Sequence, residues 1–325
     1  MRRSFLPVCI ILFCWWFAGC ATDRPPITSK AIAAVTPTAE GCTVMRLSVP
    51  SAAMGRPVQI VALLPPTYQQ DPTARFPVLY ALHGSSAACD CWADMAPLRA
   101  ALVKQPMIVL MFDGDSGSMY LDSPILQTDY LRPPPKGSPT RPAPPPARSL
   151  FTTFFFDELI PSTDLLFRSH PKQRMLTGFS MGGYGAFHYM LCRPDAFVSV
   201  SSLSGAFMSM AHPSKDTSEW MSELLGDPKV NHVRFREVDI ELRLIDAVIR
   251  KIPLPPIFLH CGSDDTGLVE GNRDFARFLA AMRVPSRYLE TPGEHNWKFW
   301  RDASLGIIDF HWRTLHPQSQ SAATK

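Results

Sequence analysis

The chain has 325 residues, of which 46% are apolar and 19% charged, so it is too apolar for a disordered or fibrous protein and should fold around a sizeable core. The formal net charge is only +3, and Arg2 and Arg3 lie in a segment that we expect to be removed. The mature chain is then nearly balanced in charge, and we expect no nucleic-acid partner.

The N-terminus has the order of a secretory signal. Arg2 and Arg3 precede an apolar run at residues 5–17, which is too short to span a bilayer comfortably. The run ends in Phe-Ala-Gly-Cys, which resembles the lipobox of bacterial lipoproteins and makes Cys20 the lipidated residue. We therefore expect a signal peptide at 1–19 and an exported lipoprotein, anchored to the membrane at the periplasmic side or the cell surface. An ordinary cleaved signal is the alternative.

The segment after the signal differs from the rest of the chain. Residues 20–40 are polar and rich in proline, without apolar periodicity, which is typical of a tether. We expect the folded domain to cover residues 41–317 and to be followed by a short tail at 318–325.

Within that domain, short apolar runs rich in β-branched residues alternate with longer helical patterns. This rhythm predicts a single α/β domain with a mostly parallel central sheet and helices on both faces. The expected strands are 58–64, 78–83, 107–112, 174–178, 197–203, 257–261 and 286–291. The expected helices are 92–104, 150–167, 181–193, 268–282 and 296–315.

One segment breaks this rhythm. Residues 132–148, RPPPKGSPTRPAPPPAR, hold eight prolines and four positive charges but no acidic residue. Such a segment cannot join a sheet, so we expect an extended, polyproline-like insertion. A tolerated surface insertion is favoured over a lid or a basic arm for an anionic cell-surface polymer.

The sequence GFSMG at residues 178–182 matches the G-x-S-x-G pattern of a nucleophilic serine. It lies between an expected strand and an expected helix, which is the context that this pattern requires. Glycine is needed at residues 178 and 182 for a steric reason, because the backbone folds tightly around a nucleophile on a sharp turn and leaves no room for larger side chains. Ser180 is therefore the candidate nucleophile.

A serine hydroxyl needs a base to take its proton, and in this kind of site the order along the chain is Ser, acid, His. Of the nine histidines, His295 alone lies in a loop just after a late strand. We interpret His311 and His316, on the expected terminal helix, as surface or packing residues, and His260, within a strand, as facing the core. His295 is the candidate base.

The acid should follow the preceding strand, where Asp264 and Asp265 are adjacent. Neighbouring side chains point in different directions, so only one can accept the imidazole N–H while the other caps a helix or faces solvent. Their spacing does not choose between them.

The oxyanion of the tetrahedral intermediate that such a nucleophile forms needs two backbone donors. We expect these to be the N–H groups of Met181, directly after the nucleophile, and of Ser85, after an early strand. His83 is better explained as a buried structural histidine. Trp92 and Trp297 are candidate apolar walls for the substrate.

Five cysteines remain once the two in the signal and Cys20 are set aside, so at least one thiol stays unpaired. Cys89 and Cys91 lack the partners of a metal site, and structural thiols or a disulfide are favoured. The pairing cannot be deduced from the sequence. The five are Cys42, Cys89, Cys91, Cys192 and Cys261.

Several ordered blocks together resemble the putative-esterase family of the α/β-hydrolases. This group contains S-formylglutathione hydrolases (esterase D), tributyrin-type esterases, feruloyl and acetyl-xylan esterases, and mycolyltransferases. The resemblance implies that Asp265, three residues after the glycine of the CGSDD block, is the acid. The blocks are residues 82–84, 112–124, 155–168, 178–187, 201–207, 261–265 and 292–300.

These observations predict an exported serine ester hydrolase that forms an acyl-enzyme, needs no metal or organic cofactor and acts on a small-molecule or cell-surface ester. An acyltransferase with the same acyl-enzyme is one alternative, and a non-catalytic binding protein on a hydrolase scaffold is another. Acyl length, leaving group and oligomeric state are not predicted.

Overall fold

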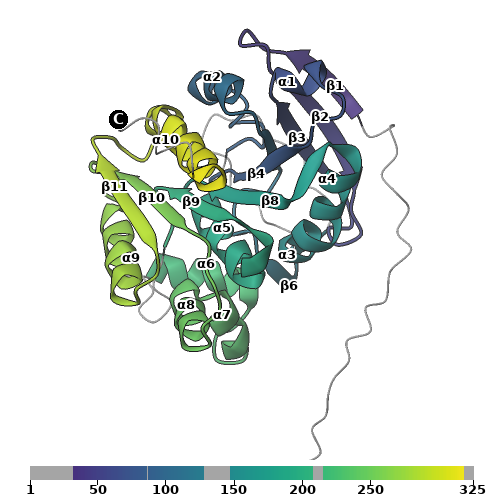
Figure 1. Cartoon of the computed structure of the whole chain (residues 1–325). Coiled ribbons are helices and arrows are strands. Elements are labelled where there is room, and N and C mark those ends of the chain that lie inside the picture. Colours follow the sequence, from purple (N-terminus) through teal and green to yellow (C-terminus); the bar gives the residue numbers. More distant parts are fainter. Residues whose placement is uncertain (1–31, 86, 128–146, 208–214, 318–325) are drawn as a thin grey trace, which may run out of the picture.

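A nine-stranded sheet organises the computed structural model, which describes residues 32–85, 87–127, 147–207 and 215–317 (Figure 1). The strand order is β1-β2-β3-β5-β4-β8-β9-β10-β11. The first four strands in this order pair antiparallel, and those from β5 to β11 pair parallel. The prediction of an α/β domain with a mostly parallel sheet is confirmed, and all seven expected strands are present. The strands are β1 (Ile32–Pro37), β2 (Thr43–Pro50), β3 (Pro57–Leu64), β4 (Phe76–Leu82), β5 (Ile108–Phe112), β8 (Ser169–Gly178), β9 (Ser199–Leu203), β10 (Ile257–Gly262) and β11 (Ser286–Thr291).

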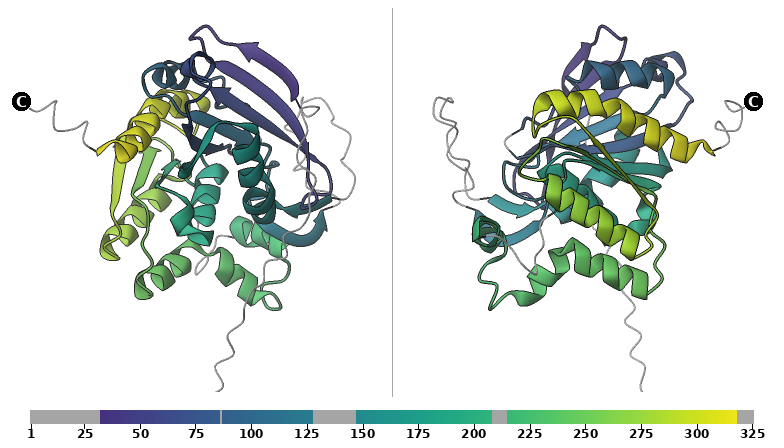
Figure 2. Two further views of the ribbon diagram at one scale, coloured as in Figure 1. Left: turned by 45° about the vertical axis from the view of Figure 1, so that its right-hand side comes forward. Right: turned by 90° about the vertical axis from the view of Figure 1, so that its left-hand side faces the viewer.

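Helices cover both faces of the sheet, as Figure 2 shows. On β3, Val61 and Leu63 belong to one core with α2 (Ala96–Lys104) and α10 (Trp297–Leu315). The alternate residue Ala62 belongs to the other core. That core includes side chains of α5 (Met181–Cys192), α8 (Ile240–Ile249) and α9 (Val269–Ala281). Helices on both faces explain why β4 and β5 are wholly buried, continuous apolar runs.

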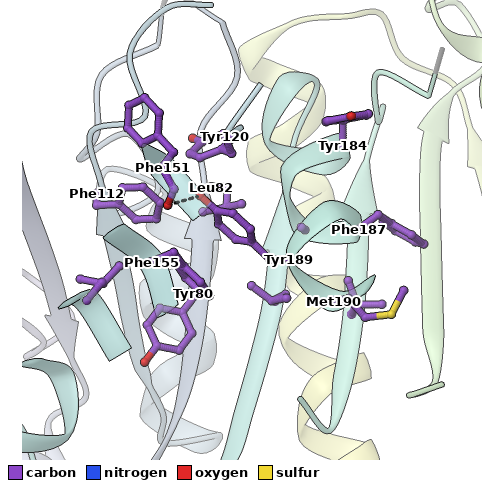
Figure 3. Packing of buried hydrophobic residues seen from close by; sticks show 14 of the residues in the cluster. Tyr80, Leu82, Phe112, Tyr120, Phe151, Phe155, Tyr184, Phe187, Tyr189 and Met190 are labelled. Atoms are coloured by element: carbon purple, nitrogen blue, oxygen red, sulfur yellow. Dashed lines mark hydrogen bonds between the residues drawn. The ribbon is translucent and has the colours of Figure 1, made fainter. Parts of the chain in front are cut away.

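A cluster of aromatic rings holds α5 against the sheet (Figure 3). The rings of Phe155 and Tyr189 stack with centroids 4.2 Å apart, and Tyr80 of β4 meets Phe155 edge-on at 5.1 Å. The Tyr189 hydroxyl donates a hydrogen bond to the Phe151 carbonyl at 3.1 Å. Burial of each ring stabilises the fold by about 1.5–3 kcal/mol, so α5, and Ser180 at its start, rest on a rigid base.

The expected helix at 150–167 is present as three consecutive pieces: α3 (Phe151–Thr153), a π-helix η2 (Phe154–Leu159) and α4 (Ile160–Leu166). Pro161 in the first turn of α4 has no N–H to donate to the preceding turn. The wider π turn just before it accommodates that missing hydrogen bond without ending the helix.

The predicted tether is too long at its C-terminal end. β1 lies within residues 20–40 and pairs antiparallel with β2, so the sheet begins before the expected domain start at residue 41. The expected helix at 92–104 also begins late, at Ala96, because turns precede it and Pro97 then opens the helix.

The proline-rich insertion lies mostly outside the described residues. Its last two residues, Ala147 and Arg148, belong to β7 (Ala147–Leu150), which pairs antiparallel with β6 (Asp122–Gln127) in a separate two-stranded sheet. The expectation that the segment joins no sheet is therefore wrong at this end, where the prolines have stopped.

Among the described residues between β9 and β10, three helices are present that were not expected from the sequence. They form the lower green part of Figure 1. The indole N–H of Trp220 donates to the Gly117 carbonyl at 2.9 Å, which ties the first of them to the loop after β5. The three are α6 (Lys215–Leu225), α7 (His232–Val238) and α8. Among the helices that the structure describes, none is both long and apolar enough to cross a bilayer.

Candidate active site

Ser180 lies at the tip of a sharp turn between β8 and α5. Its backbone has φ 54° and ψ −122°, a conformation that residues other than glycine rarely adopt. A Cβ on Gly178 would lie 2.2 Å from the Gly182 carbonyl oxygen, and a Cβ on Gly182 would lie 2.3 Å from the Leu82 carbonyl oxygen. The glycines of the motif are thus required by close backbone approaches, and the Ser180 side chain stays partly exposed.

The candidate base and one candidate acid lie in hydrogen-bond reach of each other and of Ser180. His295 Nε2 lies 3.1 Å from Ser180 Oγ, and His295 Nδ1 lies 2.7 Å from Asp265 Oδ2. The imidazole is 37% exposed, whereas the Asp265 side chain is completely buried. When Nδ1–H is donated to the carboxylate, Nε2 is left to accept the hydroxyl proton.

The surroundings of Asp265 favour its ionised form. Burial alone would raise the pKa of this carboxyl, but the hydrogen bond and charge of His295, the Ser204 hydroxyl and the Leu268 N–H together hold the pKa below its ordinary value. The Leu268 N–H donates to Asp265 Oδ1 at 3.1 Å, and the Cys261 thiol lies 4.0 Å from Oδ2. Asp265 can therefore remain a carboxylate beside a charged imidazolium.

Asp264 occupies a different position. It is exposed, and its Oδ2 accepts a hydrogen bond from the Gly293 N–H at 3.1 Å. Asp264 thus braces the loop that carries His295. Of the two adjacent carboxylates, the structure brings only Asp265 to the imidazole.

The two candidate oxyanion donors flank Ser180. Met181 is the first residue of α5, where backbone N–H groups lack helical partners. A Cβ on Gly84, which precedes Ser85, would lie 3.2 Å from Ser180 Cβ, so this loop passes close to the nucleophile. Neither the Ser85 nor the Met181 N–H donates to any residue that the structure describes. The Ser85 hydroxyl donates to the Ser116 carbonyl and anchors the loop.

The two candidate tryptophan walls differ in exposure. Trp92 is 0% exposed and donates its indole N–H to the Leu82 carbonyl at 3.2 Å. The prediction that Trp92 lines the substrate site is therefore wrong, because its ring is buried against Phe179 instead. Trp297 is 36% exposed, with its ring centroid 6.1 Å from that of Phe179, and its role as a wall stays a prediction.

The other histidines of interest are buried, and their hydrogen bonds go to groups other than Ser180. His83 accepts the Gly114 N–H at Nε2, and its Nδ1 lies 2.8 Å from the Gly84 carbonyl. His260 Nε2 lies 2.8 Å from the Thr291 hydroxyl, and His311 is completely buried. Burial lowers the pKa of all three, which keeps them neutral structural residues.

The five cysteines that follow the predicted lipidation site are all free thiols. Burial raises the pKa of the Cys89 thiol to about 12 and that of Cys42 to about 11. In the part of the chain that the structure describes, no three metal-ligating side chains gather into a cluster.

A cavity of about 470 Å³ lies beside the His295 loop rather than over Ser180. Neither Ser180 nor His295 lines it, so it is not a pocket for the group that Ser180 would attack. It is lined by His260, Asp264, Thr291, Pro292, Gly293, Glu294, Asn296, Lys298, Phe299, Asp302 and Ala303.

Two residues near the site were not identified from the sequence. Ser204 follows β9 with φ 44°, and its hydroxyl faces Asp265. The Trp300 ring lies 4.9 Å from that of His295, with the two planes at 88°. Ser204 could have been found because it directly follows a strand. Trp300 could have been found because it lies one helical turn into α10, close to His295 in the sequence.

Known proteins resemble this chain over most of its length. A profile of the family described as "Putative esterase" matches residues 51–306, a range that includes Ser180, Asp265 and His295. An acetyl esterase from Caldicellulosiruptor saccharolyticus is 26% identical over 273 residues, which cover 79% of this chain and 93% of that protein.

Solved structures share the fold at lower identity. An S-formylglutathione hydrolase from Agrobacterium tumefaciens superposes with a TM-score of 0.71 at 17% identity, over 87% of this chain and 99% of that one. A fluorophosphonate-binding serine hydrolase from Staphylococcus aureus gives a TM-score of 0.67 at 20% identity, over 85% and 99% of the two chains.

Proposed function

Because the chain belongs to the putative-esterase family and is a serine esterase of the α/β-hydrolase fold, we propose that it hydrolyses short acyl esters through an acyl-enzyme on Ser180. The observation that carries the proposal is the 3.1 Å contact between Ser180 Oγ and His295 Nε2, with Asp265 behind the imidazole. A nucleophile within reach of a base that is itself oriented by an acid is the arrangement that acyl transfer needs.

The chemistry follows from these contacts. Ser180 Oγ attacks the ester carbonyl while His295 Nε2 takes the hydroxyl proton, and Asp265 stabilises the resulting imidazolium. The tetrahedral intermediate then breaks its bond to the alcohol, which leaves with the proton from His295. Water repeats the sequence on the acyl-enzyme, and the acid and free Ser180 are released.

The negative charge that develops on the carbonyl oxygen needs donors that are already in place. We assign this role to the N–H groups of Ser85 and Met181, which have no other acceptor among the described residues. Met181 also places the positive end of the α5 dipole at the site. The loss of one such donor typically lowers kcat by about 10²–10³-fold.

Two observations support a short acyl group in the substrate. The acetyl esterase relative aligns over 93% of its own length, and the cavity beside the His295 loop does not open onto Ser180. That cavity therefore offers no wall to an acyl tail bound at Ser180, and a tail that is not enclosed contributes no transition-state binding. We therefore propose acyl groups of no more than about eight carbons.

The location of the enzyme is a proposal from the N-terminal sequence. Residues 1–19 and Cys20 have the order of a lipoprotein signal, and they lie outside the described residues. In an exported compartment a glutathione thioester is scarce, so an oxygen ester from the surface or the surroundings is the favoured substrate.

A panel of esters that differ in both halves tests the substrate proposal. Acetyl, butyryl, octanoyl and palmitoyl esters of one alcohol should show kcat/KM falling steeply beyond about eight carbons. S-formylglutathione should be no better a substrate than the acetyl ester. A kcat/KM that rises through the palmitoyl ester, or activity confined to S-formylglutathione, would contradict the proposal.

A further inference from the structure

Phe179, the residue before the nucleophile, lies at the junction of the elements that form the site. Its side chain is 1% exposed, although the neighbouring Ser180 is partly exposed. Its ring belongs to the core shared by the sheet, α2 and α10. The backbone is fixed as well, because the Phe179 N–H donates to the Leu82 carbonyl at 3.3 Å.

The Phe179 ring meets the oxyanion loop. A Cβ on Gly84 would lie 2.7 and 2.8 Å from two ring carbons of Phe179, so the backbone of that loop rests directly on the ring. Trp92 supports the same place, with its ring centroid 5.5 Å from that of Phe179. The Trp92 indole N–H donates to the Leu82 carbonyl, the acceptor that Phe179 also uses. The position of Ser85 thus depends on the Phe179 ring.

The ring also meets the element that follows the base. Trp300 stacks on Phe179 with centroids 4.4 Å apart and planes 19° from parallel. The same Trp300 ring lies 4.9 Å from the His295 imidazole, with the two planes at 88°. A ring packed perpendicular to the imidazole restricts its rotation about χ2, the motion that would move Nε2 away from Ser180 Oγ.

We propose that Phe179 is a positioning residue that couples the oxyanion loop to the base: its ring packs against Gly84, which precedes Ser85, and against Trp300, which in turn packs against His295. The proposal rests on the function proposed for Ser180 and His295. It explains why a bulky, buried aromatic ring stands directly beside the nucleophile, although the motif itself specifies only the glycines on either side.

The expected effect is on turnover rather than on substrate binding. Displacing a reacting group by about 1 Å can cost about 10²-fold in rate. Phe179→Leu removes the flat ring but keeps an apolar side chain, so we expect kcat to fall about 10- to 100-fold while KM changes less than about threefold. Trp300→Leu should act in the same way, and Trp300→Phe, which keeps a ring for stacking, should lose much less.

The test measures kcat per competent active site. Sites are counted by titration with a fluorophosphonate that reacts with the nucleophile, so a merely misfolded fraction does not lower the value. Wild type, Phe179→Leu, Trp300→Leu and the double variant form a cycle. Because both changes release the same imidazole, the double variant should lose less than the product of the two single losses.

Phe258→Leu is the matched control. Phe258 is 2% exposed and pairs with Phe310 of α10 at 5.4 Å, so its loss leaves a similar cavity in the same core. Its melting temperature should fall, while kcat per titrated site should stay within about twofold of wild type.

The outcomes separate this inference from the proposed function. Full kcat per site in both Phe179→Leu and Trp300→Leu, or losses that multiply in the double variant, would overturn the positioning role while the esterase assignment stands. If wild type itself is not labelled at Ser180, the proposed function fails first. If Phe179→Leu does not fold, Trp300→Leu against Trp300→Phe still decides the question.

Discussion

Ser180 is held in an uncommon backbone conformation by hydrogen bonds from several directions. A residue other than glycine at φ 54° costs about 1–3 kcal/mol. The Ser180 N–H donates to the Leu203 carbonyl, while the N–H groups of Gly183 and Ala206 both donate to the Ser180 carbonyl, each at 3.0 Å. These bonds offset the strain and fix the direction in which the hydroxyl projects.

The adjacent carboxylates should respond very differently to neutralisation. Asp265→Asn removes the charge that orients and stabilises the imidazole, so kcat should fall about 10²–10⁴-fold. Asp264→Asn can still accept the Gly293 N–H through its amide oxygen and should lose far less. Steady-state kinetics on both variants, with circular dichroism to verify folding, provide the comparison. A larger loss in Asp264→Asn would show that the geometry around His295 has been misassigned.

The difference between these two residues also marks a limit of the sequence. The motif around Ser180 and the loop around His295 are local patterns, so both residues could be identified from their flanking elements. Asp264 and Asp265 are equivalent by spacing, and they differ only in which side chain is buried beneath the imidazole. The prediction for Trp92 failed for the same reason, because burial against Phe179 depends on packing between distant parts of the chain.

At the scale of elements, a buried histidine joins α10 to the sheet. His311 Nδ1 lies 2.7 Å from the Ser199 hydroxyl and Nε2 lies 2.8 Å from the Ser201 hydroxyl, both on β9. The Ser201 hydroxyl donates to Thr177 at 2.8 Å, so it accepts Nε2–H, and Nδ1 accepts from Ser199. Both nitrogens of the neutral imidazole are therefore hydrogen-bonded.

This arrangement makes stability depend on pH. Burial lowers the pKa of His311 to about 3, whereas an unfolded histidine has a pKa of about 6.5. Below about pH 6.5 the unfolded chain binds a proton that the folded chain does not, so stability falls as pH falls towards about 3. Between pH 7 and pH 5 this residue alone should lower the free energy of unfolding by about 2 kcal/mol.

His311→Asn provides the comparison, because asparagine does not titrate. The variant should be less stable than wild type at pH 7, and the gap in unfolding free energy should narrow by about 2 kcal/mol at pH 5. Urea unfolding at the two pH values measures both quantities. A gap that stays constant or widens as pH falls would show that His311 does not carry this dependence.

The accuracy of the predicted elements follows from how strong their local signals are. Buried parallel strands such as β4 and β5 are continuous apolar runs and were found with nearly correct bounds. β1 was missed because IAAVTP is short and lies in a polar, proline-rich region. Apolar residues at helical spacing were available in the sequences of α8, IELRLIDAVI, and α6, KDTSEWMSELL, and both helices were overlooked, whereas α7, HVRFREV, is short and mostly polar.

For the whole molecule, the parallel sheet explains how distant residues meet. Ser180, Asp265 and His295 follow β8, β10 and β11, whose carboxyl ends lie at one edge of the sheet. Ser180 and His295 are separated by 115 residues along the chain, yet their side chains touch. This convergence follows from the strand order, and so the fold class and the chain order Ser, Asp, His could be predicted together.

Membrane attachment should depend on one residue. If Cys20 carries the lipid, Cys20→Ser removes the anchor, and the enzyme should move from the membrane fraction to the soluble fraction. Esterase activity in each fraction after ultracentrifugation measures the shift, and the wild-type chain is the control. Membrane association that is unchanged in Cys20→Ser would contradict the lipoprotein proposal without affecting the active site.

The central claim is that Ser180 is the nucleophile of a serine esterase, and covalent labelling tests it most directly. The enzyme is treated with a fluorophosphonate, and the modified residue is located by mass spectrometry while ester hydrolysis is followed in parallel. We predict a single adduct on Ser180, loss of hydrolysis in proportion to labelling, and neither labelling nor more than about 10⁻⁴ of wild-type kcat in folded Ser180→Ala. An adduct on another residue, or about a tenth of wild-type activity in folded Ser180→Ala, would contradict the account.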